Sequence, residues 1–212
     1  MSEQHASEFK LISCVLSKGD GTEPTALDRD MIAALSVHES LVSPFMGATM
    51  MISDSKGLLN SFPVQGGENI DIKLKTTWED NPIAYKFKIF KIVSRVIKNK
   101  QQLYTLALTS EEVFTNETVR VEKLQTGNPS DIVATLIRKE LKSSKQIYSE
   151  KTKFEVRHLP GRSRPFDIIA NLTKRSVSNK AVYKNVKKNI RGSKTEIKQE
   201  IKGSAGFFFW ES

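Results

Sequence analysis

The sequence has little of what most enzymes need. Its 212 residues include one cysteine, Cys14, so an intramolecular disulfide is excluded, as suits a reducing compartment. The three histidines stand alone, without other ligand-type residues at metal-binding spacing. No nucleophile elbow, phosphate-binding loop or dinucleotide fingerprint occurs. We therefore expect a protein that is not an enzyme and holds no metal or cofactor, with Cys14 packed in a core.

Long apolar segments are also missing. The first ten residues lack the basic region and apolar stretch of a secretory signal. No apolar run approaches the ~20 residues that a membrane-spanning helix needs. We expect a chain that is made in the cytoplasm, stays soluble and has no membrane partner.

The net charge of +9 is concentrated in one segment. Lys180–Ser204 holds eight basic residues and two glutamates, so the rest of the chain carries only +3. We predict a basic flexible loop or linker over residues 179–204. An alternative is a nucleic-acid-binding module, although Tyr183 is the segment's single aromatic residue. The residues that would contact an anion are Lys184, Lys187, Lys188, Arg191 and Lys194.

The first 112 residues show the period-two alternation of β-strands. The clearest runs are Met31–Leu41, Ala48–Ile52, Ile70–Lys75 and the hairpin Ala84–Leu108, while Phe9–Leu16 fits either a strand or a helical turn. Short strands separated by turns are typical of a small sandwich or barrel, so we predict an antiparallel β-barrel-like tube domain over residues 1–112.

Two irregularities interrupt this pattern. The alternation slips at Ile89-Phe90 and again at Ile92-Val93, where apolar residues are adjacent. Such slips indicate either β-bulges or a second buried face. Gly66-Gly67 lacks the third glycine of a nucleotide-binding loop, and we interpret it as a turn or bulge.

Residues 113–178 predict a small α/β domain. Asn128-Pro129 supplies a capping residue and a proline at the first helical position, which predicts a helix over Ser130–Leu141. Arg164-Pro165 opens a second predicted helix, and Lys153–Arg157 is strand-like. Arg162 and Arg164 could hold a phosphate before that helix, but no glycine-rich cradle accompanies them, so we favour a solvated turn.

The segment 205–212 contains four consecutive aromatic residues, Phe207, Phe208, Phe209 and Trp210. We expect an apolar strand that opens a second barrel, and three alternatives remain for it. It pairs back onto the first barrel, another chain completes it, or the chain is a fragment. The predicted fold class is therefore α+β and β-rich: a tube domain, a small α/β domain and one further strand.

These segments, in this order, resemble the central hub protein of contractile phage tails. That baseplate protein joins the tail tube to the spike, and its core is similar to the N-terminal part of type VI secretion spike proteins. The segments that carry the resemblance are the turn Ser43-Pro44-Phe45, Leu58–Glu68, the hairpin strands Tyr85–Phe90 and Tyr104–Glu112, the helices Ser130–Leu141 and Arg164–Ile169, and Gly206–Ser212.

The resemblance implies a structural virion protein of the tail baseplate, assembled in the host cytoplasm. It implies two barrel-like domains per subunit, so that a homotrimer presents six similar barrels and adapts a six-fold tube to a three-fold spike. The implied partners are further copies of the chain, the tail-tube protein and the central spike protein. Nucleic acid would only pass through the tube.

The sequence departs from the family in one respect. Family members continue past the aromatic strand, whereas the second barrel is missing here. We expect a truncated or split version, whose second barrel a separate chain completes. Phe207–Trp210 would then be the interface, because burying four aromatic side chains at roughly 150–250 Å² each contributes strongly to binding.

Overall fold

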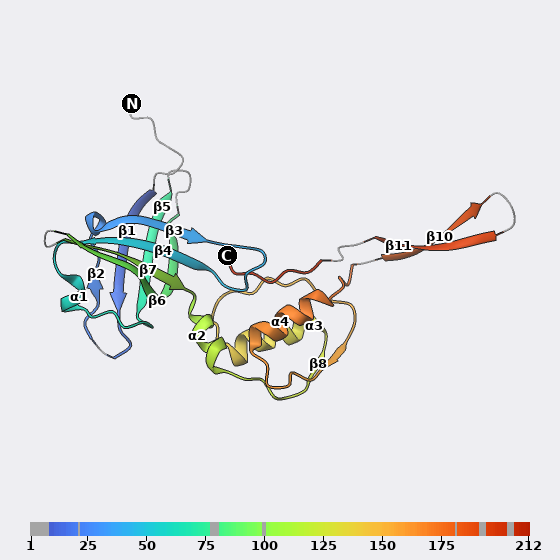
Figure 1. The fold of residues 1–212 in the computed structure, drawn as a ribbon. Coiled ribbons are helices and arrows are strands. Elements are labelled where there is room, and N and C mark those ends of the chain that lie inside the picture. Colours follow the sequence, from blue (N-terminus) through green and yellow to red (C-terminus); the bar gives the residue numbers. More distant parts are fainter. Residues whose placement is uncertain are drawn as a thin grey trace, which may run out of the picture. The chain divides into compact units, whose positions relative to one another are not determined.

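The computed structural model describes residues 9–20, 22–76, 81–98, 101–180, 182–190, 194–202 and 206–212 (Figure 1). The chain divides into two compact units. The first comprises Met1–Phe114 with Glu211–Ser212, and the second comprises Thr115–Trp210. The finer domain limits expected from the sequence, at residues 112, 178 and 204, stay predictions.

A seven-stranded antiparallel sheet forms the first unit. Its strands are β1 (Phe9–Ser17), β2 (Thr25–Ala26), β3 (Ile32–His38), β4 (Gly47–Asp54), β5 (Asn69–Thr76), β6 (Ile83–Lys98) and β7 (Gln101–Thr109). They lie in the order β2-β1-β5-β6-β7-β4-β3, and the sheet curls into a half-barrel (Figure 1). Short helices follow β4 and β7, at α1 (Leu58–Ser61) and α2 (Glu111–Thr118). The predicted β-rich, antiparallel class is confirmed, as an open sheet with β2 and β3 at its edges.

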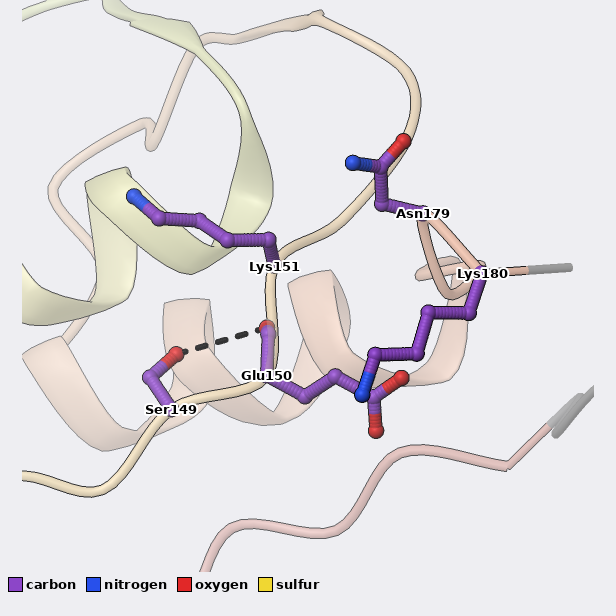
Figure 2. A pocket seen from close by; sticks show the side chains of 5 residues that line it. All are labelled: Ser149, Glu150, Lys151, Asn179 and Lys180. Carbon is purple, nitrogen blue, oxygen red and sulfur yellow. Dashed lines mark hydrogen bonds between the residues drawn. The ribbon is translucent and has the colours of Figure 1, made fainter.

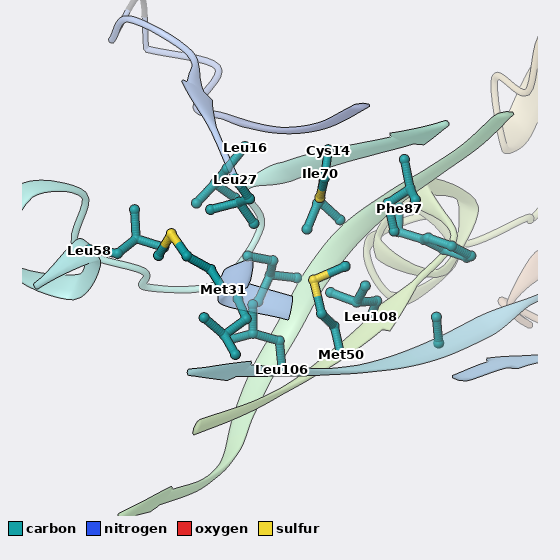
Figure 3. Close-up of a cluster of buried hydrophobic side chains, with 14 of the residues drawn as sticks. Cys14, Leu16, Leu27, Met31, Met50, Leu58, Ile70, Phe87, Leu106 and Leu108 are labelled. Atoms are coloured by element: carbon teal, nitrogen blue, oxygen red, sulfur yellow. The ribbon is translucent and has the colours of Figure 1, made fainter. Parts of the chain in front are cut away.

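The concave face of the sheet is filled by every second residue of its strands (Figure 3). Ile70, Ile72, Met50, Ile52 and Ile89 are fully buried. Because successive side chains in a strand point to opposite faces, the alternation seen in the sequence becomes one apolar layer. These buried side chains form the hydrophobic core of the first unit.

The central hairpin of the sheet contains two β-bulges. Ile89 pairs with Leu108 and Lys91 with Ala107, so Phe90 between them has no partner. The same shift between Ile92 and Ser94 leaves Val93 without a partner. Both slips in the sequence alternation are therefore bulges, and the predicted hairpin Ala84–Leu108 is confirmed.

A tight turn precedes β5. Gly66 and Gly67 have positive φ angles of 107° and 92°, which glycine adopts without the steric cost of a side chain. The buried Glu68 carboxylate accepts hydrogen bonds from the N–H groups of Gln65 (2.6 Å) and Gly66 (2.9 Å). This confirms the turn that the two glycines predict.

The second unit contains two helices around a small apolar core. These are α3 (Pro129–Thr135), continued by a π-helical turn over Leu136–Glu140, and α4 (Pro165–Lys174). Both begin with proline, as predicted. A two-stranded sheet joins β8 (Gln125–Gly127) to β9 (Val156–His158), which begins later than the predicted strand Lys153–Arg157. The fully buried side chains here include Leu136, Ile168 and Ile169.

The lysine-rich segment forms a hairpin instead of the flexible loop expected from its composition. Strands β10 (Val182–Ile190) and β11 (Lys194–Lys202) pair along their whole length. The register sets Lys184 opposite Glu200 and Lys188 opposite Glu196. The total charge of the segment, with eight cations and two glutamates, did not reveal this hairpin, because a total contains no information on pairing.

The aromatic segment forms no strand. Residues 206–212 are irregular, and no strand among the described residues pairs with them. A strand needs a neighbouring edge to satisfy its backbone groups, and the segment is held by side-chain contacts instead. The prediction of an apolar strand over residues 205–212 is therefore wrong for the described part.

Candidate protein interaction surfaces

The four aromatic residues of the final segment differ in exposure. Phe208 and Trp210 are 58% and 44% exposed, whereas Phe207 and Phe209 are half-buried. The Phe209 ring lies 6.1 Å from that of Phe166, centroid to centroid, in a tilted arrangement of 43°. Alternate residues therefore face the protein and solvent, and Phe208 and Trp210 are the two that offer apolar surface.

Phe166 is itself fixed by a residue that sequence reasoning missed. Its backbone N–H donates a hydrogen bond to the Asn116 side-chain oxygen at 2.9 Å, and both residues are buried. The first N–H groups of a helix have no partner within the helix, so Asn116 from α2 caps the start of α4. An asparagine 50 residues earlier gives no sequence signal of this role.

Glu211 fixes the end of the same segment within the first unit. Its carboxylate accepts a hydrogen bond from the Met46 backbone N–H, at 3.0 Å, just before β4 begins. The Met46 carbonyl accepts another from the Ser110 N–H at 3.1 Å. Met46 is thus held on both sides by residues distant in sequence.

The two arginines before α4 are engaged in ion pairs. Arg162 lies 3.1 Å from Glu122, and Arg164 lies 2.8 Å from Glu117, with all four side chains substantially exposed. Paired, solvated arginines favour the interpretation of this segment as a turn over that of a phosphate site.

The candidate anion contacts lie on the β10–β11 hairpin. Lys184, Lys187 and Lys188 belong to β10, and Lys194 begins β11. Arg191 lies outside the described residues. The hairpin brings four of the five candidates onto one two-stranded element, and their role in binding stays a prediction.

Cys14 is a packing residue rather than a nucleophile. It lies in the core of the sheet with 2% of its surface exposed. Burial, and secondarily the negative charge of Asp71, raises the pKa of the thiol to about 12. A thiol that stays protonated at neutral pH is a poor nucleophile. Among the described residues, no group of three His, Cys, Asp or Glu side chains could hold a metal ion.

Tyr104 and Asp54 are two buried polar residues of the sheet. Both are 1% exposed, and neither the Tyr104 hydroxyl nor Asp54 Oδ2 has a hydrogen-bond partner. Burial and the Asp54 charge raise the pKa of Tyr104 well above its usual range. Asp54 Oδ1 accepts the N–H groups of Lys56 (3.0 Å) and Gly57 (2.7 Å), so its role is to hold the turn after β4.

A surface depression of about 340 Å³ lies in the second unit (Figure 2). Its lining residues are Ser149, Glu150, Lys151, Asn179 and Lys180. Figure 2 shows the Glu150 and Lys180 side chains pointing toward one another, and Ser178 donates a hydrogen bond to the Glu150 carboxylate. Lys151 pairs with Asp131 at 2.7 Å. The charges are thus balanced locally, and the depression favours neither an anion nor a cation.

No helix in the described part of the chain combines the length and apolarity that crossing a bilayer requires.

Comparison with known proteins finds similar structures but no similar sequences. The sequence matches no protein-family model and no curated protein sequence. The fold is similar to the tail protein from Neisseria meningitidis MC58, with 9% identity and a TM-score of 0.48, over 76% of this chain and 44% of that one. It is also similar to the prophage tail protein gp18 from Listeria monocytogenes EGD-e, with 10% identity and a TM-score of 0.46, over 81% and 47%.

A component of the E. coli type VI secretion system is a further similar structure. That protein is described as resembling the bacteriophage T4 tail proteins gp27 and gp5. The identity is 8% and the TM-score 0.39, over 85% of this chain and 45% of that one. The chain thus spans less than half the length of each of these three proteins.

Proposed function

We propose that the chain is a structural subunit of a contractile-tail baseplate hub, which joins the tail tube to the central spike. The observation that carries the proposal is the seven-stranded antiparallel sheet curled around a hydrophobic core. Such a sheet is suited to form the wall of a tube, because its buried side chains line the concave face and its edges and outer face are left for contacts with other proteins. The ordered resemblance of the segments to hub proteins supports this interpretation.

The proposed subunit works without catalysis. It assembles with further copies into a ring, with tail-tube protein on one face and spike protein on the other. A homotrimer with two similar barrels per subunit would match six-fold symmetry above and three-fold symmetry below. Phe208 and Trp210 are the exposed aromatic residues through which the chain would meet a second barrel-like domain.

Reconstitution with the proposed partners tests this function. The purified chain is mixed with the tail-tube and spike proteins encoded beside it, and the mixture is analysed by size-exclusion chromatography and negative-stain microscopy. We expect co-migration with both proteins and ring-shaped particles. Separate elution of all three proteins, with no rings, would count decisively against a hub.

The β10–β11 hairpin favours nucleic-acid binding as a second candidate function. It pairs with no other strand of the described chain, and its two strands carry six lysines. Filter binding over a series of salt concentrations tests it, because phosphate contacts predict a steep loss of affinity with salt. Weak binding that does not respond to salt would exclude the candidate.

A further inference from the structure

The two bulges of β6 create an apolar strip on the outer face of the sheet. In the ladder Ser94 lies opposite Thr105, and Val96 opposite Leu103, which places these residues on the face away from the core. Each bulge adds one unpaired residue beside that outer set. The result is Phe90, Val93 and Val96 at a spacing of three residues, 55%, 57% and 60% exposed. In a regular strand, side chains three residues apart would point to opposite faces of the sheet.

This strip is embedded in positive charge. Strand β6 contains Lys86, Lys88, Lys91, Arg95 and Lys98 and no acidic residue. The Lys91 ammonium lies 5.7 Å from the centre of the Phe90 ring, so a cation borders the apolar surface directly. An outer sheet face is normally polar, and a partner for this one must offer apolar side chains beside negative charge.

The turn between β3 and β4 offers that combination. The Ser43 N–H donates a hydrogen bond to the Ser40 carbonyl at 3.1 Å, which puts Leu41 and Val42 at the two central positions. Turn centres are usually glycine, asparagine, aspartate or proline. Here they are apolar and 55% and 85% exposed, with exposed Glu39 just before them.

The charge around this turn is opposite to that of β6. Between Ile32 and Ser55 the chain has no lysine or arginine, although it carries +9 overall. Glu39 is the exposed acidic residue beside the turn, because Asp54 is buried at the other end of β4. The turn and the strip are both exposed within one copy, with β7 and β4 between their strands in the sheet order. An exposed apolar turn beside an acidic residue and an exposed apolar strip beside cations are complementary, which fits a head-to-tail contact between copies.

We propose that the β3–β4 turn of one copy docks on the β6 strip of a second copy. Leu41 and Val42 cover Phe90, Val93 and Val96, and Glu39 lies near Lys91. This inference rests on the proposed function, in which copies form a ring, and it names the surfaces that join them. A contact between different patches repeats around a ring when its rotation closes.

Cross-linking with introduced cysteines tests the contact. The native Cys14 is buried, so new surface cysteines react selectively with a short bismaleimide. We expect the Val42→Cys and Val93→Cys proteins to form a cross-linked dimer when mixed and neither to do so alone. The matched control is Ile12→Cys, another exposed apolar bulge residue of the same sheet, which should give no product with Val42→Cys.

Charge exchange tests the specificity of the contact. Lys91→Glu and Glu39→Lys should each weaken self-association, measured by sedimentation, about tenfold, and the double variant should recover most of the loss. Phe90→Ser should weaken it by at least about tenfold, whereas Ile12→Ser should leave it unchanged.

Three results would overturn the inference. They are a wild-type chain that stays monomeric at all concentrations, equal cross-linking to positions 12 and 93, and single charge variants that associate like the wild type. These results are separable from failure of the proposed function. A chain that joins tube and spike proteins but shows no turn-to-strip contact remains a hub, and its copies meet elsewhere.

Discussion

The carboxylate of Glu211 and the backbone N–H of Met46 are joined by a 3.0 Å hydrogen bond across 165 residues of sequence. Met46 is 5% exposed, so its N–H group would otherwise lack a partner at the start of β4. A buried donor that is left without an acceptor costs free energy, because it has no water to bond with instead. The bond therefore couples the last residues of the chain to the stability of the sheet.

Removing this acceptor should destabilise the protein. We expect Glu211→Ala to lower the free energy of unfolding by about 1–2 kcal/mol in urea denaturation, and Glu211→Gln to cost less because its side-chain oxygen still accepts. Ser212→Ala, at an exposed neighbouring position, is the control. A Glu211→Ala protein as stable as this control would contradict the assignment.

The cap of α4 predicts a pair of opposite results at Asn116. Asn116→Ala leaves the buried Phe166 N–H unpaired and should cost about 1–2 kcal/mol, whereas Asn116→Asp keeps an acceptor and adds a charge that the helix N-terminus favours. Hydrogen exchange at the Phe166 amide should accelerate in the alanine variant alone. Equal acceleration in both variants would show that Asn116 acts by packing.

Because the Tyr104 hydroxyl has no hydrogen-bond partner, we expect its removal to cost little stability. Tyr104→Phe removes a buried group that has no hydrogen-bond partner, so the free energy of unfolding should stay within about 1 kcal/mol of the wild type or rise. Leu106→Ala, two residues along the same strand, should instead cost about 2–5 kcal/mol because it leaves a cavity. A large loss in Tyr104→Phe would indicate an ordered water on the hydroxyl.

Alkaline pH should unfold the protein through two buried groups. The pKa values of Cys14 and Tyr104 are raised above ordinary values of 9.0 and 10.0, so the folded state keeps protons that the unfolded state releases. Their contribution is complete below about pH 9 and is lost progressively as the pH rises toward the folded-state values. Denaturant titrations across this range should show the decline.

Substitution identifies the groups responsible. In the Cys14→Ala, Tyr104→Phe double variant the decline above about pH 9 should be shallower than in the wild type. In the wild type the thiol should react with a maleimide only after unfolding. An unchanged slope in the double variant would assign the alkaline transition to other residues.

The sequence predicted the sheet well because burial there follows a period of two. Ile70, Ile72 and Leu74 are all buried, as their alternation with charged residues indicates. The short α1 was missed, since four residues carry no periodicity. The helix α2 was missed because its sequence lacks a clear apolar face, although Glu111 and Glu112 are acidic residues of the kind that favour a first turn.

The candidate surfaces were harder to predict than the fold. The aromatic run Phe207–Trp210 was identified by composition, but half of it packs against its own protein through Phe209 and Phe166. The partner of Phe166, Asn116, is a long-range contact that no local pattern encodes. The lysine-rich hairpin depends on its pairing register, which total charge does not reveal.

The bulges of β6 have a consequence for how the chain tolerates change. Phe90 and Val93 stand outside the ladder, so deleting either one would leave every other partner in β6 and β7 where it is. The deletion would only straighten and untwist the strand locally. We therefore expect that either bulge residue can be deleted without breaking the hydrogen bonds between β6 and β7. Phe90 and Val93 therefore contribute exposed apolar surface on a curved strand more than they support its hydrogen bonds.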